Sequence, residues 1–256
     1  MNVGIIQQET PRVYGAGGAT REGNSPDLTQ LPPPYACVID PCAFAREGIV
    51  SLMTEEGGGE VSSLDSGTAY LQLPLDERLR PVSLLVYRLP TALPPLLEAL
   101  CFLRRFLTLH LQDAPTGRRP QTRVVVLTDL PPFWLYDTLR SPLHPKGALL
   151  SVSVLPAHCR PQQLRTVLAG MEAHALLAPL ALKTPTWRRT RGLNAGELDV
   201  LRRSLVDKLT IADQARLGRK GVKTLYSQRL SAMRKLGVRS LSGLLRWSVR
   251  SRKGQL

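Results

Sequence analysis

The segment VKTLYSQRLSAMRKLGV, residues 222–238, carries a narrow apolar stripe among many cationic and hydrogen-bonding side chains. Its apolar residues recur at intervals of three, seven and four, from Val222 through Leu225 and Ala232 to Leu236. This spacing predicts an amphipathic helix. Gly237 follows directly and suits the left-handed position at which helices commonly end, so it predicts a sharp stop.

The opposite face of this predicted helix is rich in hydrogen-bond donors. It carries Lys223, Thr224, Ser227 and Gln228, and the turn before it carries Arg219 and Lys220. The major groove of B-DNA is wide enough to admit a helix. Lys and Arg bind phosphates, while Ser, Thr and Gln reach phosphates or base edges. We therefore expect a helix that enters a DNA groove, with an ordinary solvated amphipathic helix as the alternative.

The net charge of +14 is concentrated at the C-terminal end of the chain. Residues 183–256 hold 19 of the 34 Lys and Arg but only four of the 20 Asp and Glu, while the preceding residues are almost neutral. Such asymmetry points to a polyanionic partner for this segment alone. A basic tail that only aids solubility is the alternative, but the periodic apolar residues of the segment favour a small folded core.

Residues 193–256 predict an all-α domain of four helices with short turns. The expected helix starts carry side chains that cap backbone N–H groups, namely Asn194 with Glu197, Thr210 with Asp213, and Ser240. Residues 218–221, with sequence GRKG, form the turn before the helix described above.

Residues 35–182 alternate short apolar runs with helical runs. Strands are predicted at residues 35–40, 60–64, 82–89, 123–128 and 148–155, and helices at 43–53, 95–112 and 161–177. Continuous apolar strands separated by helices predict an α/β domain with a parallel sheet covered on both faces. Residues 1–34, rich in Gly and Pro, predict a flexible leader, and the basic residues 183–192 predict a linker.

The C-terminal segment resembles the LuxR/FixJ-type helix-turn-helix. That family opens with Leu-Thr-x-x-Glu-x-Glu-Val-Leu, which here is the run 193–201, and closes its recognition helix with Lys-Leu-Gly-Val, here residues 235–238. The sequence SQRLSAMRKLGV, residues 227–238, is most similar to the capsule-regulator (Rcs) branch of the family. In that branch, as at Gln228 here, Gln replaces the His of the recognition helix. The resemblance implies DNA contacts from the recognition helix, for which we add Lys235 to the donors named above.

The resemblance also implies that the fourth helix pairs two molecules. Its apolar residues are Leu241, Leu244 and Leu245, with Trp247 nearby. Packing inside a small core is the alternative role for these side chains.

Residues 35–182 resemble a receiver domain of a response regulator, which has a flavodoxin-like fold. The run Arg46-Glu47-Gly48 matches the receiver pattern, and Asp40 matches its first acidic residue, but Pro41 replaces the second. The position that corresponds to the phosphoacceptor Asp holds Tyr87.

Two further positions complete the comparison with a receiver. The Thr after the fourth strand is present as Thr128, but Ser153 stands near the position of the usual Lys. Phosphoryl transfer to a carboxylate needs that carboxylate, a divalent cation held by acids, and a cation facing the product. The resemblance therefore implies a pseudo-receiver without phosphorylation chemistry, in which Asp40 caps a strand end.

The sequence shows none of the motifs GxSxG, GxxxxGK[ST] and HExxH, and its four Cys form no CxxC pair. We therefore expect no enzyme activity, no cofactor and no metal. We expect a cytoplasmic, nucleoid-associated bacterial transcription regulator that binds double-stranded DNA as a homodimer, or as a heterodimer with another LuxR-type regulator. The alternatives are a regulator controlled by a small ligand and an adaptor protein that modulates another regulator.

Overall fold

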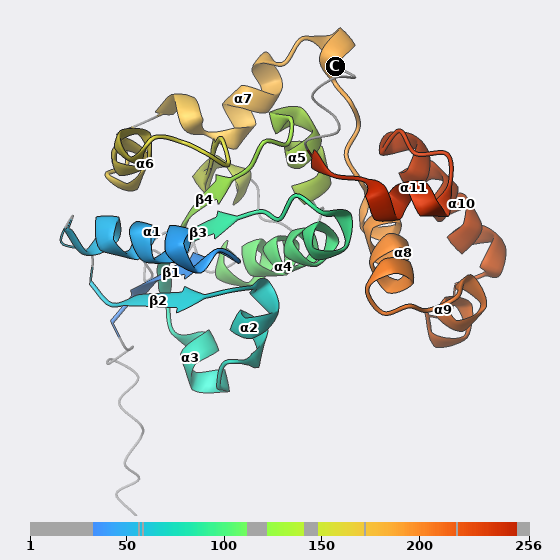
Figure 1. Ribbon diagram of the computed structural model, residues 1–256, viewed down its shortest axis with the longest axis horizontal. Helices are drawn as coiled ribbons and strands as arrows, with labels where there is room; N and C mark the ends of the chain where they lie inside the picture. The colour runs from blue at the N-terminus through green and yellow to red at the C-terminus, as the bar shows by residue number, and fades with distance from the viewer. Residues whose placement is uncertain are drawn as a thin grey trace, which may run out of the picture. The chain divides into compact units, whose positions relative to one another are not determined.

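Five parallel strands form a sheet in this computed structural model, which describes residues 33–55, 57, 59–111, 122–140, 148–171, 173–218 and 220–249. The strands are β1 (Tyr35–Ile39), β2 (Val61–Leu64), β3 (Val82–Arg88), β4 (Arg123–Leu127) and β5 (Val152–Leu155). They are ordered β2-β1-β3-β4-β5 across the sheet. Figure 1 labels the first four of these strands. The predicted parallel sheet is confirmed, including its strand near residues 60–64.

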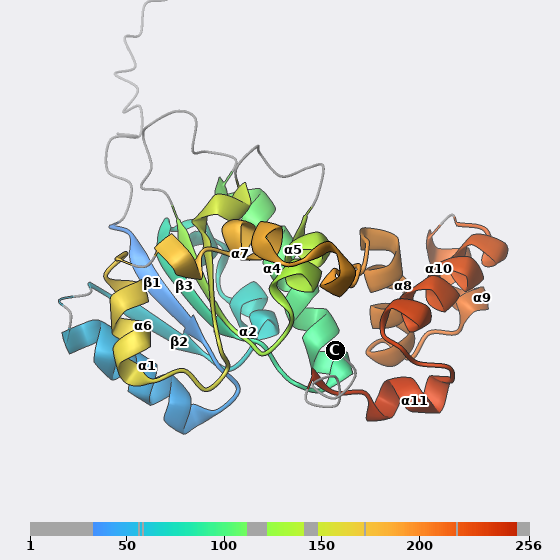
Figure 2. The same ribbon diagram turned by 90° about the horizontal axis from the view of Figure 1, so that it is seen from above.

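Helices cover both faces of this sheet (Figure 2). On one face, α1 (Ala43–Glu55) and α6 (Pro161–Leu168) bury Ile49 and Leu164 against β1 and β3. On the other face, α4 (Leu93–Leu111) and α5 (Pro132–Leu139) bury Leu100 and Trp134. Two covered faces explain why every residue of β1 is buried, since strands between two layers have no solvent side.

Two of the predicted elements are shorter than expected. The helix expected at 161–177 ends at Leu168, because Gly170 adopts a positive φ of 78°. The chain continues through a 3-10 turn, η3 (Ala173–Ala175), and a separate helix, α7 (Leu177–Lys183). The strand expected at 148–155 begins with another 3-10 turn, η2 (Ala148–Ser151), so only its second half joins the sheet.

Several helices described before residue 183 were not predicted. They include α2 (Gly67–Gln72), α3 (Leu75–Leu79) and α5, and α7 lies beyond the predicted helix except for its first residue. Two prolines stand at the start of α5, Pro131 just before the helix and Pro132 as its first residue. The first turn tolerates Pro132 because the missing N–H removes no helical hydrogen bond there.

The four C-terminal helices are present as predicted. They are α8 (Ala195–Leu205), α9 (Ile211–Gly218), α10 (Val222–Lys235) and α11 (Leu241–Arg246). The first capping pair is confirmed, because the Glu197 N–H donates to Asn194 Oδ1 at 2.9 Å and the Asn194 N–H donates to Glu197 Oε2 at 2.8 Å. Gly237 has the expected positive φ, 69°, after α10.

The segment predicted as a linker contains a 3-10 turn, η4 (Thr186–Arg188), and its end is attached to α5. The Gly192 N–H donates to the Asp137 carboxylate at 2.9 Å, and the Leu193 N–H donates to Thr138 Oγ1 at 3.0 Å. Apolar side chains of α8 continue the core that α4 and α5 form on the sheet, and the described residues belong to one compact unit. The boundaries 35–182, 183–192 and 193–256 remain predictions, and the predicted leader lies almost wholly outside the described residues.

None of the helices in the described part of the chain combines the length and the apolar character needed to cross a membrane.

Candidate nucleic-acid interface

The exposed side of α10 carries several of the hydrogen-bond donors that the sequence predicted to contact DNA. Leu225 and Ala232 are buried and fix one side of this helix against the domain. Lys223, Thr224 and Ser227 are all exposed. Residues four apart on a helix lie on the same side, so Lys223 and Ser227 are neighbours. The structure therefore places three predicted DNA contacts on one accessible surface.

A small core holds α8, α9 and α10 together behind this surface. Val200, Ile211 and Leu225 contribute one buried side chain from each helix. Gln214 of α9 is also buried, and its amide donates to Ser204 Oγ of α8 at 2.9 Å. A structural role for Gln214 was not predicted from the sequence. Its position among the apolar residues of an amphipathic helix could have indicated that this polar side chain is buried. This core fixes the orientation of α10 relative to the two preceding helices.

Lys235 has a different role from the one predicted, because it is engaged inside the domain. Its ammonium donates to Glu197 Oε2 at 2.7 Å and to the Gly192 carbonyl at 2.8 Å. Glu197 is 2% exposed and also accepts from Ser231 Oγ at 2.6 Å. Burial raises the pKa of Glu197, but hydrogen bonds from Lys235, Ser231 and the Asn194 N–H outweigh it and hold that pKa below its usual value. We therefore correct the prediction: Lys235 attaches α10 to α8.

Gln228 is only partly exposed, because its side chain packs against the start of α8. A Cβ atom added to Gly196 would lie 2.4 Å from Gln228 Nε2, so the glycine creates the space that this amide occupies. Gln228 Oε1 is buried and has no hydrogen-bond partner among the described residues. A base contact from Gln228 stays a prediction, and it requires the side chain to leave Gly196.

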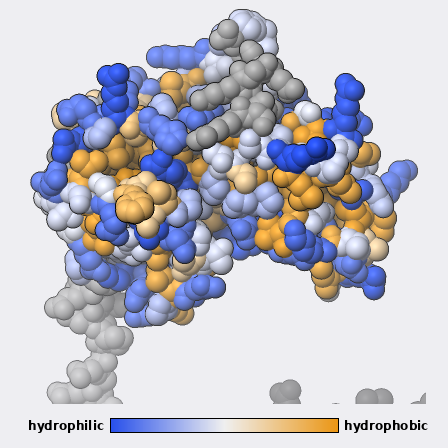
Figure 3. Space-filling view, in the orientation of Figure 1, coloured by the Kyte–Doolittle hydropathy of each residue, from blue (hydrophilic) through white to orange (hydrophobic). Residues whose placement is uncertain are grey.

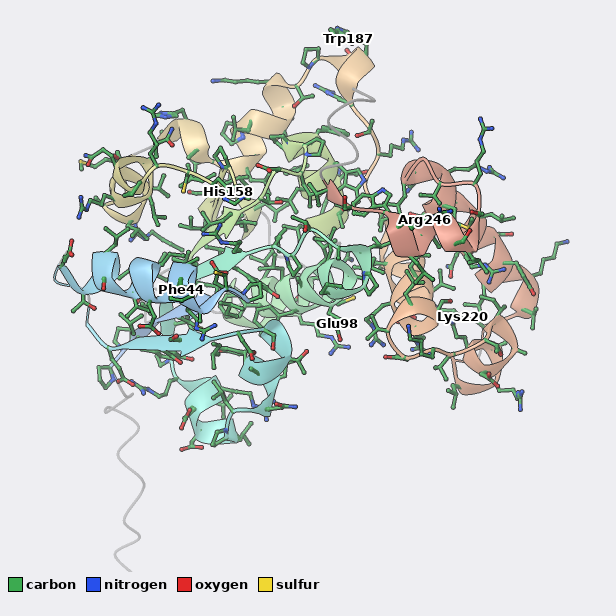
Figure 4. All side chains as sticks on the ribbon, in the orientation of Figure 1. Phe44, Glu98, His158, Trp187, Lys220 and Arg246 are labelled. Atoms are coloured by element: carbon green, nitrogen blue, oxygen red, sulfur yellow. The ribbon has the colours of Figure 1, made fainter. Side chains whose placement is uncertain are left out.

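Of the two basic residues expected in the turn before α10, the structure describes one. Lys220 is exposed (Figure 4), and its ammonium lies 3.9 Å from the Asp199 carboxylate. Arg219 lies outside the described residues.

The four residues predicted to pair two molecules divide into two groups. Leu244 is fully buried and Trp247 is 7% exposed, with its Nε1 donating to the Leu236 carbonyl at 3.1 Å. These two side chains stabilise the core of the domain, so their predicted role in pairing is wrong. Leu241 and Leu245 are exposed and remain available for a partner.

In the receiver-like segment, an arginine occupies the space around the acidic residue. Asp40 is fully buried, and its Oδ2 lies 2.5 Å from Arg88 Nε, while Oδ1 accepts from the Cys42 N–H at 2.9 Å. The Arg88 guanidinium also donates to the Ala157 carbonyl. Arg88 was not predicted, although an Arg that ends an apolar strand was a visible signal. Asp40 therefore has an internal cation as its partner.

The other residues of the expected phosphorylation pocket serve the packing of the domain. Tyr87 is 3% exposed and packs edge-on against Phe102, with ring centroids 5.6 Å apart, and burial raises the pKa of its phenol. Thr128 is buried and accepts from the Leu130 N–H at 3.2 Å. Ser153 lies within β5, paired with β4. The described residues contain no cluster of three or more His, Cys, Asp or Glu side chains placed to hold a metal ion.

Pro41 is exposed, and together with Tyr87 it lines a cavity of about 180 Å³ at the carboxyl ends of β1 and β3. The side chains of Phe102, Arg105 and Arg202 also line this cavity. The strand order reverses between β1 and β3, and such a point is where open parallel sheets commonly bind ligands.

No protein-family model matches the sequence, and neither does any curated protein. Solved structures do match. RcsB from Salmonella enterica serovar Typhimurium, bound to promoter rprA with the phosphomimetic BeF3-, is 21% identical, with a TM-score of 0.50 over 83% of this chain and 96% of that one. The chain has the RcsB fold. A second RcsB–DNA complex is 18% identical, with a TM-score of 0.47 over 83% of this chain and 96% of that one. The response regulator ChrA is 17% identical, with a TM-score of 0.33 over 86% of this chain and 96% of that one.

Proposed function

We propose that this protein is a sequence-specific DNA-binding transcription regulator. The observation that carries the proposal is α10, which exposes Lys223, Thr224 and Ser227 on one side while Leu225 and the core behind it hold the other side in place. The positive charge of the C-terminal segment supports a polyanionic partner. RcsB, whose fold the chain shares, has been solved bound to promoter DNA. A cytoplasmic, nucleoid-associated location follows from this function.

The experiment is selection of a preferred duplex from a random pool, followed by titration with the full chain at several salt concentrations. Lys223→Ala should weaken binding to all duplexes and lower the slope of log affinity against log salt by about 0.9, because one phosphate contact is lost. Lys183→Ala removes the same charge from the exposed end of α7 and serves as the control. If no duplex is preferred over random DNA, the proposal is wrong and the adaptor function gains support.

The regulator works without phosphorylation in this proposal. Arg88 is paired with Asp40, and Tyr87 holds the position of the phosphoacceptor, so the pocket lacks the carboxylate that would accept a phosphoryl group, and its first acidic residue already has a cation as partner. Incubation with acetyl phosphate and magnesium should leave the mass of the protein unchanged. A hydroxylamine-sensitive gain of one phosphoryl group would contradict this part of the proposal.

We further propose that the protein binds DNA as a dimer, either with itself or with another regulator. One helix-turn-helix contacts a single half-site, so pairing adds affinity and specificity. The exposed Leu241 and Leu245 lie four residues apart on α11 and form an apolar row. The double variant Leu241→Glu, Leu245→Glu should sediment as a monomer if this row pairs two molecules. Unchanged sedimentation of a dimeric protein would exclude it.

A second candidate function is control by a small ligand. The cavity at the switch point of the sheet favours it, because Arg202 of α8 lines this cavity together with Tyr87 of the sheet. A bound small molecule would therefore touch both the sheet and a helix of the DNA-binding segment. A metabolite that raises the melting temperature of the wild-type protein but not that of a Phe102→Trp variant would support this function.

A further inference from the structure

Three apolar side chains on α10 remain exposed although the helix already has a buried side. Val222, Tyr226 and Leu230 are 46%, 47% and 49% exposed. They are four residues apart, so they form one row along the helix. Apolar side chains are visible among the hydrophilic ones on the C-terminal helices in Figure 3. The row borders the buried side formed by Leu225, Ala232 and Met233. Around the helix axis, Met233 lies within about 20° of Val222 and Tyr226, whereas Leu230 is about 60° away from it.

Leu230 lies within the side of α10 that carries the hydrogen-bond donors. With 3.6 residues per turn, Leu230 is rotated by about 20° from Lys223, about 60° from Ser227 and about 40° from Arg234 around the helix axis. Lys223, Ser227 and Arg234 are all exposed. Leu230 therefore has the polar and cationic groups that we propose to face DNA on one flank, and Tyr226, about 40° away, on the other.

The charges around Leu230 decide between two kinds of partner. A protein surface that covered Leu230 would also desolvate Lys223 and Arg234, which is unfavourable unless acidic groups pair with them. DNA supplies phosphates for both cations at the margins of the groove and removes Leu230 from water in the same step. A DNA groove is thus the partner that suits the leucine and its cationic neighbours together.

The major-groove edge of DNA has one apolar group, the C5 methyl of thymine. Leu230 cannot donate or accept a hydrogen bond, so this methyl is the only group on that edge that it can recognise. We infer that Leu230 of α10 reads the C5 methyl group of a thymine in the preferred DNA site. Tyr226 borders the contact, and its ring is already covered on one face by the Arg229 guanidinium, 4.9 Å from the ring centroid.

The inference rests on the proposed function, and its test begins with the duplex selected there. Each thymine of that duplex is replaced, one at a time, by deoxyuridine, which removes the methyl group and keeps the base pair. At one of these positions, the loss of the methyl contact should weaken the affinity of the wild-type protein for the duplex about fourfold. The same substitution should have no effect on the Leu230→Ala variant, because the two changes remove the same contact.

The matched control is Leu79→Ala on α3, which removes a leucine that is 65% exposed and lies outside α8–α11. This variant should keep the fourfold sensitivity to deoxyuridine. Circular dichroism verifies that Leu230→Ala is folded, and if it is not, Leu230→Ser at this half-exposed position takes its place in the same deoxyuridine series.

Four outcomes are distinguished by this design. Failure to select any duplex would refute the proposed function and the inference with it. A selected duplex that the wild-type protein binds equally at every deoxyuridine position would refute the inference alone. Sensitivity that persists in Leu230→Ala would assign the methyl contact to another residue. Weaker self-association of that variant, with no change in its DNA binding, would instead identify Leu230 as part of a protein contact.

Discussion

Replacement of Lys235 by Met tests whether this residue stabilises the fold or contacts DNA. The substitution keeps most of the side-chain length and removes the ammonium, together with its hydrogen bonds to Glu197 and to the Gly192 carbonyl. Glu197 would then retain Ser231 and the Asn194 N–H as donors, but it would lose its cation. The variant therefore leaves a buried carboxylate without a counter-charge.

The expected loss of stability follows from the burial of the pair. Removing one partner of a fully buried ion pair costs about 3–5 kcal/mol. The Lys235 side chain is 21% exposed and that of Glu197 is 3% exposed, so water can reach the edge of this pair. Some solvation of the remaining carboxylate reduces the cost, and we expect the free energy of unfolding at pH 7 to fall by about 2–3 kcal/mol. For a chain of this size, that corresponds to a decrease of about 4–12 °C in the melting temperature.

The dependence of this loss on pH has a definite sign. The pKa of Glu197 is lowered in the folded protein, so its ionised form contributes stability above the unfolded value of about 4.5, and this contribution disappears as the pH falls through the lower folded value. Without the ammonium, the folded pKa of Glu197 rises and its carboxyl becomes neutral at a higher pH. The difference in stability between wild type and variant should therefore shrink from pH 7 to pH 4.

Urea unfolding followed by circular dichroism at pH 7, 5.5 and 4 measures this difference, and DNA titration at several salt concentrations measures the other role. The salt slope of Lys235→Met should equal that of the wild type, measured where both proteins are folded. A difference below about 0.5 kcal/mol at pH 7, typical of a surface residue, would refute the structural role. A salt slope about 0.9 lower than that of the wild type would instead support the phosphate contact predicted from the sequence.

Three further variants test local packing, each by urea unfolding against the wild type. Gly192→Ala should destabilise the protein by about 1–3 kcal/mol, because its Cβ would lie 2.4 Å from the Trp134 carbonyl oxygen, and a change below 0.5 kcal/mol would contradict this contact. Gly196→Ala should cost less than about 1 kcal/mol, because its Cβ meets only the movable end of Gln228, and its preferred DNA sequence should change if the displaced amide reaches a base. Trp247→Phe should cost about 1–3 kcal/mol through the loss of the Nε1 donor, and an unchanged midpoint would show that the bond is not needed.

The sheet and the C-terminal helices were predictable from the sequence because their signals are local. Strands between two helical layers bury both sides and are therefore mostly apolar, as in β1, which is apolar throughout, and in the central part of β3. Helix starts with capping side chains, such as Asn194 before α8, identify their own boundaries. The helix α5 was missed because Pro usually ends a helix, and its tolerance in the first turn depends on the register of the helix.

The candidate site was only partly predictable, for a related reason. A helical period separates a buried side from an exposed one, and it identified Lys223, Thr224 and Ser227 correctly as exposed. It cannot distinguish side chains near the border of the two sides, so the ion pair of the partly exposed Lys235 with Glu197 was not foreseen, and core packing of Leu244 was only the alternative to its pairing role. The pairing of Asp40 with Arg88 joins residues 48 positions apart, and it depends on the neighbouring ends of two parallel strands.

The pairing of Asp40 with Arg88 also limits how this chain can evolve. A carboxylate introduced at position 87 would stand next to an arginine whose charge already belongs to Asp40, and no second acid would be present at Pro41. Removing Arg88 first would leave Asp40 buried without a counter-charge, at a cost of about 3–5 kcal/mol, which is a large share of the stability of an ordinary domain. A single substitution at position 40 or 88 therefore leaves the other side chain without its partner. We expect the two residues to change together rather than one at a time.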